Sequence, residues 1–263
     1  MDWQLQHKNS ENNSARLPVE FIIACVIVFI AGVSATIYFN RSMGDEMQMS
    51  GGWKMSMMWM RMPGQTSFMS TLSFLLMWLA MMVAMMMPSA LPMFLKTQRQ
   101  GLSLCYMASG YFAIWLIAGF GIYVLGIEFN DAAMRSKFLS RAVPLLAGAS
   151  LIVAGLVQFT GWKMTHLLRC RSQFGCAASC PENKTSFGLG CKQGIACCAC
   201  CSVLMITQLV LGIMNPIVMI LVAIVIAAEK LFPRPEIVAS VVGIATMVAG
   251  ITMTFHWVMV NYT

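Results

Sequence analysis

The sequence predicts an all-α fold, a polytopic bundle of about seven transmembrane helices. Hydrophobic residues make up 59% of the 263 residues and charged residues only 10%, which lies outside the usual composition of soluble domains. Several apolar stretches reach the roughly 20 residues that a helix needs to cross the hydrocarbon core of a bilayer. The chain is therefore expected to be a multi-pass protein surrounded by lipid.

The N-terminal part predicts a tail and an anchor. Residues 1–16 are polar and of mixed charge, which indicates a short flexible tail, and residues 17–39 form the first span. The alternative is a signal peptide with Val33-Ser34-Ala35 as its cleavage site. The long mixed-charge lead and the length of the apolar run favour an uncleaved anchor.

Loops and prolines divide the rest of the chain. Residues 40–67 form a methionine-rich loop and residues 163–194 a polar, cysteine-rich loop. The second span is expected to end at Pro88, and Asn215-Pro216 predicts a tight reversal after the fifth span. If the fifth and sixth spans form a re-entrant hairpin, the count falls to six. The spans after the anchor are residues 68–87, 102–127, 142–162, 195–213, 216–228 and 237–258.

The distribution of Lys and Arg predicts that the N-terminus is inside and the C-terminus outside. In this orientation the inner segments hold eleven of the 17 basic residues and the outer segments six. The net charge of +7 is then explained by the Lys and Arg residues that set the orientation of the spans. The sequence has no basic stripe with interleaved aromatic residues that would indicate a nucleic-acid partner. The methionine-rich loop lies outside, where thioethers form no disulfides, and the cysteine-rich loop lies in the reducing cytoplasm.

Methionine is concentrated near the start of the bundle. Sixteen of the 26 methionines lie between Met43 and Met93, and half of these sixteen lie in the outer loop. Thioethers two or three residues apart could close around one Cu(I) or Ag(I), because soft sulfur ligands select such ions. The alternative is an apolar loop that rests on the membrane interface.

The second predicted span carries a methionine stripe. Met77, Met81 and Met85 repeat at four-residue spacing and share one face of a helix, with Met82 and Met86 beside it. A stripe that faces the bundle offers a ladder of weak, exchangeable sulfur ligands across the bilayer. Ordinary packing explains the same pattern, since methionine fills irregular gaps well.

Eight of the ten cysteines lie between Cys170 and Cys201. Cys197 and Cys201 share one helical face, and Cys200 lies one turn from Cys197. His166 lies one turn before Cys170 on the extension of the fourth span. This pattern predicts a metal site. Its candidate ligands are Cys170, His166, Cys197, Cys198, Cys200 and Cys201.

The ligand chemistry favours Cu(I) as the bound ion. Zn(II) accepts a tetrahedral set of three cysteines and one histidine, so a structural zinc site is the main alternative. An iron–sulfur cluster has weaker support from the spacing. Four thiols within five residues suit low-coordinate Cu(I) better than one closed tetrahedron.

Other polar residues within the spans are few. Gln158 and Gln208 are expected to form helix-packing hydrogen bonds, and no proton relay is evident. Glu229 and Lys230 mark the inner end of the sixth span, where Lys230 is expected to snorkel toward water.

Four short motifs occur in order within residues 68–232. They are Met77-Trp78 with the run from Ala84 to Met93; Gln158, Lys163, Cys170 and Arg171; Cys197, Cys200 and Cys201; and Met214-Asn215 with Glu229-Lys230. In these motifs the sequence resembles the bacterial family of predicted metal-binding integral membrane proteins, domain of unknown function 2182. The resemblance implies a metal-binding core in the bacterial inner membrane and no established activity. His166 stands where that family has a cysteine, and histidine also ligates metals.

The sequence carries no recognisable catalytic motif, so we do not expect an enzyme. The leading hypothesis is a copper-handling protein that captures Cu(I) on the outer loop and passes it to or from the cytoplasmic cysteines. A copper chaperone is then an expected partner. The alternatives are an accessory subunit of a larger membrane copper oxidase or monooxygenase complex with a fixed metal, and a thiol redox protein.

Overall fold

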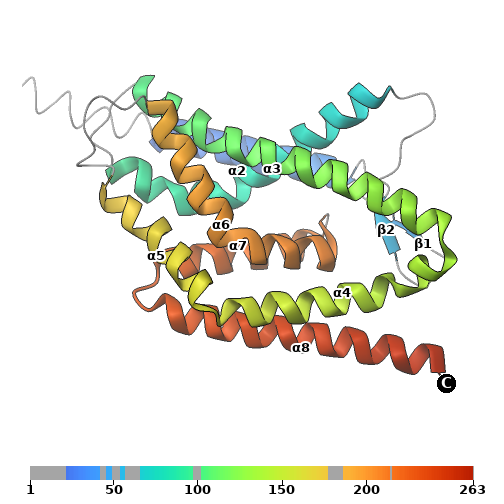
Figure 1. Cartoon of the computed structure of the whole chain (residues 1–263). Coiled ribbons are helices and arrows are strands. Elements are labelled where there is room, and N and C mark those ends of the chain that lie inside the picture. The colour runs from blue at the N-terminus through green and yellow to red at the C-terminus, as the bar shows by residue number, and fades with distance from the viewer. Residues whose placement is uncertain are drawn as a thin grey trace, which may run out of the picture.

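The described chain is almost entirely helical (Figure 1). The computed structural model describes residues 22–41, 46–48, 54–56, 66–96, 102–176, 186–213 and 215–262. The predicted tail, much of the outer loop and Cys180 lie outside the described residues. The all-α class is confirmed, with one addition that the sequence did not predict. Two short antiparallel strands, β1 (Glu46–Gln48) and β2 (Lys54–Ser56), pair with Met47 opposite Met55.

The described residues include eight helices. They are an N-terminal helix Ile22–Arg41, α2 (Ser67–Lys96), α3 (Leu102–Arg135), α4 (Lys137–Gln158), α5 (Gly161–Cys176), α6 (Ser186–Gly212), α7 (Pro216–Leu231) and α8 (Pro235–Tyr262).

Local chemistry explains several helix boundaries. The Ser136 side chain accepts a hydrogen bond from the Leu139 N–H and caps α4. The Asn215 side chain does the same for the first turn of α7, where Pro216 takes the position in which a missing N–H costs nothing. Gly212 closes α6 with a φ of 118°, a left-handed conformation that favours glycine.

Six of the described helices are long and apolar enough to cross a membrane. α7 has 16 residues and is not one of them. The multi-pass helical class is therefore supported, while the predicted count of seven and the orientation stay predictions. The six candidate spans are Ile22–Arg41, Ser67–Leu91, Ser103–Arg135, Lys137–Gln158, Ser186–Gly212 and Pro235–Met259.

Two segments are more helical than the sequence predicts. α2 continues through Pro88 to Lys96, although proline removes a backbone donor, because membrane helices tolerate proline where neighbouring groups replace the lost bonds. Much of the predicted loop 163–194 is also helical, since it contains most of α5 and the first turns of α6. The cysteines described in this region therefore project from helices rather than from an irregular loop.

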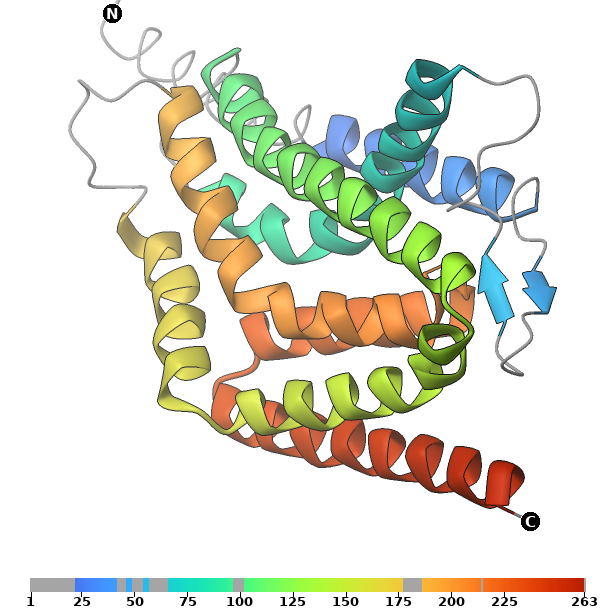
Figure 2. The same ribbon diagram turned by 45° about the vertical axis from the view of Figure 1, so that its right-hand side comes forward.

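Close backbone contacts fix the helix pairs. α4 and α8 lie side by side along one edge of the molecule (Figures 1 and 2). A Cβ on Gly250 would lie 2.7 Å from the Gly148 carbonyl oxygen, so only glycine allows this approach. α3 and α6 pair in the same way, because a Cβ on Gly190 would overlap the Met107 carbonyl. This second pair sets the position of α6, which carries the cysteine run.

α2 is the central helix of the bundle. In its apolar stretch of 18 residues, 67% are buried inside the protein, against 50% or less in every other candidate span. Five of its methionines belong to the same buried core as Cys170, Cys197, Cys200 and Cys201: they are Met77, Met81, Met82, Met85 and Met86. The stripe on α2 thus faces protein and not lipid.

Candidate metal centre

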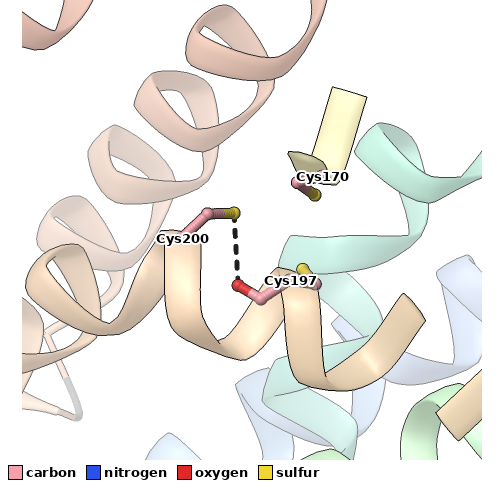
Figure 3. Close-up of side chains that lie close together, drawn as sticks. All are labelled: Cys170, Cys197 and Cys200. Atoms are coloured by element: carbon pink, nitrogen blue, oxygen red, sulfur yellow. Dashed lines mark hydrogen bonds between the residues drawn. The ribbon is translucent and has the colours of Figure 1, made fainter. Parts of the chain in front are cut away.

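Three thiols from two helices converge inside the bundle. Cys170 lies on α5, and Cys197 and Cys200 lie on α6; their Sγ atoms are all within 4.8 Å of one another. Figure 3 shows Cys170 facing the turn of α6 that carries the other two. Each of the three residues is at most 1% exposed. This is the group in the described chain whose ligand atoms could share one metal ion.

A fourth thiol extends the group. Cys201 Sγ lies 3.5 Å from Cys200 Sγ and 4.0 Å from Cys197 Sγ, and Cys201 is equally buried. The spacing of three and four residues along α6 places these side chains on one face of the helix. Cys200 also donates to the Cys197 carbonyl at 3.3 Å, which holds its side chain against the helix. The pattern Cys197, Cys200, Cys201 is thus a local consequence of helix geometry.

Cys170 completes the group from outside α6. Hydrogen bonding with Cys197 is the largest of the effects that raise the pKa of the Cys170 thiol to about 12. The thiol therefore carries its proton until a metal ion displaces it.

Two polar side chains from other helices contact Cys197, and a third contacts one of them. The Tyr111 hydroxyl on α3 lies 2.9 Å from Cys197 Sγ. Lys230 Nζ, at the end of α7, donates to the same sulfur at 3.0 Å and to Ser89 Oγ on α2 at 3.2 Å. Lys230 is only 5% exposed, so the expectation that it snorkels toward water is wrong. The reason is that one face of α7, with Val222 and Ile226, packs into the core, and the last turn of this face ends there.

A buried ion pair lies beside the thiol cluster. Lys163 Nζ on α5 lies 2.8 Å from Glu229 Oε2 on α7, and both side chains are at most 3% exposed. The same Nζ donates to the Cys200 carbonyl at 2.7 Å, and Gln158 Nε2 on α4 donates to Glu229 Oε1 at 3.3 Å. Arg171 Nη1 reaches the Glu229 carbonyl at 3.2 Å. The network ties α4, α5, α6 and α7 together around the thiols.

The thioether stripe meets the thiols at one end. Met77, Met81, Met85 and Met86 are each at most 3% exposed. Gln208 Nε2 on α6 donates to Met81 Sδ at 3.3 Å, so the expected packing role of Gln208 includes a sulfur contact. Lys230 Nζ lies 3.9 Å from Met86 Sδ, which places the last thioether of the stripe and the Cys197 thiol against the same ammonium.

Two predicted ligands lie apart from the converged thiols. His166 is half-buried and packs on Trp162, with ring centroids 4.5 Å apart. Cys198 is half-buried, and successive residues on a helix point in different directions. The group of atoms within 4.8 Å includes neither side chain, and their roles as ligands stay predictions.

Sequence reasoning missed the polar side chains next to the thiols. Tyr111, Ser89 and Lys230 come from three different helices, so no local spacing connects them to Cys197. The available signal was the presence of Glu229 and Lys230 in an apolar sequence, because ionisable residues inside a membrane protein are usually functional.

The donor set is soft. Three or four thiols with a neighbouring thioether stripe match the sulfur ligands that Cu(I) prefers. In the comparison with protein families, residues 75–253 match the model PpoB2, whose description is copper chaperone. The chain belongs to the PpoB2 family. The converged thiols and the α2 stripe all lie within the residues that match the PpoB2 model.

The other two comparisons are negative. No curated protein and no solved structure matches the chain. The match to PpoB2 agrees with the metal-binding family that the motifs resemble, although it does not confirm the name of that family. It supports a copper-related membrane protein with a cysteine site.

Proposed function

We propose that this member of the PpoB2 family binds Cu(I) at Cys170, Cys197 and Cys200, with Cys201 alongside, and transfers it across the membrane. The proposal depends on the convergence of three thiols from two helices within 4.8 Å, in the buried core of a chain that belongs to a copper chaperone family. The thiols act as ligands and not as catalysts, and we propose no enzymatic turnover.

The proposed route runs along α2. Cu(I) is captured by thioethers of the outer loop, moves along Met77, Met81, Met85 and Met86, and reaches Cys197. Burial of these four methionines in the bundle supports such a route, and the shared Lys230 contact brings its end to the thiols. Thiolates bind Cu(I) more strongly than thioethers, which favours inward movement, but a chaperone in the cytoplasm could withdraw or supply the ion.

The route implies an orientation. We propose that the N-terminus is inside, the C-terminus outside, and the protein in the bacterial inner membrane. This orientation requires an odd number of crossings, so in the seven-span topology α7 acts as a short span of 16 residues that returns to the level of Cys197. The six-span alternative, in which the fifth and sixth spans form a re-entrant hairpin, places both termini on the same side of the membrane.

The cysteine site is tested by replacing two of its thiols. The double variant Cys197→Ser with Cys200→Ser is expected to lose nearly all bound copper, because a serine hydroxyl is a hard ligand that Cu(I) does not prefer. Copper and zinc are measured by elemental analysis of protein purified under reducing conditions. Cys105→Ser is the matched control, since Cys105 lies exposed on α3, outside the group. A double variant that keeps wild-type copper would contradict the proposal.

A second candidate function is an accessory subunit with a fixed metal. The near-complete burial of the three thiols favours this alternative, because a buried site exchanges metal slowly. It predicts a stable partner in stoichiometric amount after purification in mild detergent. A chain that is purified alone and still moves Cu(I) into liposomes supports transfer instead.

A further inference from the structure

Lys230 holds a buried ammonium group beside the thiols. Its Nζ lies 3.0 Å from Cys197 Sγ, 3.2 Å from Ser89 Oγ and 3.9 Å from Met86 Sδ. The residue is 5% exposed, and these three neighbours are buried as well. The ammonium therefore lies where the thioether stripe of α2 meets the thiol group of α5 and α6.

Lys230 differs from the other buried lysine of the core in its partners. Lys163 is neutralised by Glu229 at 2.8 Å, whereas no carboxylate of the described residues lies within ion-pair distance of Lys230. A buried charge without a partner is costly, so buried charges in proteins are paired. Among the groups that the described core places within hydrogen-bond distance of Lys230 Nζ, the Cys197 thiol is the one that can supply a negative charge.

A bound Cu(I) ion creates this negative charge. Each thiol that binds the ion as a thiolate gives up its proton. One monovalent ion with two thiolates carries one negative charge in total, and a third sulfur can complete the site as a neutral thiol. Such an anion in the buried core needs one positive neighbour. Lys230 is a single cation at contact distance from one of the ligands.

We propose that Lys230 is a positioning residue that supplies the counter-charge for a Cu(I)–thiolate complex at Cys170, Cys197 and Cys200. This inference rests on the proposed function. This counter-charge makes the site selective for a monovalent ion, because with the same number of thiolates a divalent ion forms a complex with one negative charge fewer, which gains less from the ammonium.

The test separates charge from structure. Lys230→Gln removes the charge and keeps an N–H donor, and Lys230→Met gives a second variant without either. The matched control is Lys163→Met with Glu229→Gln, which removes the other buried lysine together with its carboxylate and so leaves the net charge unchanged. Affinities for Cu(I) and for Cd(II) are measured on the full chain in detergent, by competition with a chelator under anaerobic conditions.

We expect Cu(I) to bind about 10- to 100-fold more weakly to both Lys230 variants, the usual range for loss of a group that supports metal ligands. Cd(II) affinity is expected to fall much less, so the ratio of the two affinities changes. The control is expected to keep the wild-type ratio. Equal losses for both ions, unchanged Cu(I) affinity, or tighter Cu(I) binding would each overturn the role of Lys230. Wild-type protein that binds no Cu(I) would instead refute the proposed function, and this inference with it.

Discussion

Lys163→Met is expected to be the most destabilising single substitution in the polar network around the thiols. The substitution leaves Glu229 buried without its partner at 2.8 Å and removes the donor to the Cys200 carbonyl at 2.7 Å. Breaking a buried ion pair by removing one partner typically costs about 3–5 kcal/mol. The free energy of unfolding in mixed detergent micelles should fall by this amount.

Two variants check the origin of the effect. Adding Glu229→Gln to Lys163→Met should restore part of the lost stability, because no unpaired carboxylate then remains in the core. Lys192→Met is the surface control, since the Lys192 side chain is exposed on the first turns of α6. Its effect should stay within about 0.5 kcal/mol. A Lys163→Met variant as stable as this control would show that the ion pair does not hold the helices around the thiols.

The second large effect is expected from the thioether stripe. Replacing Met77, Met81, Met85 and Met86 together with leucine removes four buried sulfur atoms and keeps similar side-chain volumes. A leucine side chain has no donor atom that can bind a metal ion. A Cu(I) ion moving along α2 would therefore lose its ligands within the bundle. Entry of Cu(I) into liposomes that contain the protein should slow by about tenfold or more, where tenfold corresponds to about 1.4 kcal/mol of barrier.

The stripe experiment has an internal control for the cysteine site. The leucine variant should still bind copper when the ion is supplied to detergent-solubilised protein, because Cys170, Cys197 and Cys200 are untouched. Met69→Leu with Met134→Leu removes two exposed methionines and should leave transfer unchanged. Wild-type transfer rates in the stripe variant would remove α2 from the route, and the methionines would then be packing residues.

Helix periodicity accounts for what could be predicted about the site. Cys197, Cys200 and Cys201 share a face because their spacing matches the helical repeat, and the methionines of α2 form a stripe for the same reason. Helix periodicity predicts which side chains share one face of a helix, but it does not predict how deeply each of these side chains is buried. His166 and Cys170 are one turn apart on α5, yet the first is half-buried and the second is in the core.

Contacts between distant helices could not be read from the sequence. Tyr111 and Lys230 reach Cys197 because α3 and α7 pack against α6, and the packing of α3 depends on close approach at glycines such as Gly190. The position of α7 also decides whether Lys230 faces water or the core. An apolar stretch ending in a lysine is compatible with both, and only the arrangement of the surrounding helices distinguishes them.

X-ray absorption at the copper edge tests most directly whether the converged thiols hold Cu(I). The sample is the full-length protein, purified under reducing conditions and loaded with one equivalent of Cu(I). We expect a Cu(I) edge and a first coordination shell of sulfur alone, and loss of that shell in the variant Cys197→Ser with Cys200→Ser. A shell of nitrogen or oxygen ligands, or a sulfur shell unchanged in the double variant, would contradict copper binding at these thiols.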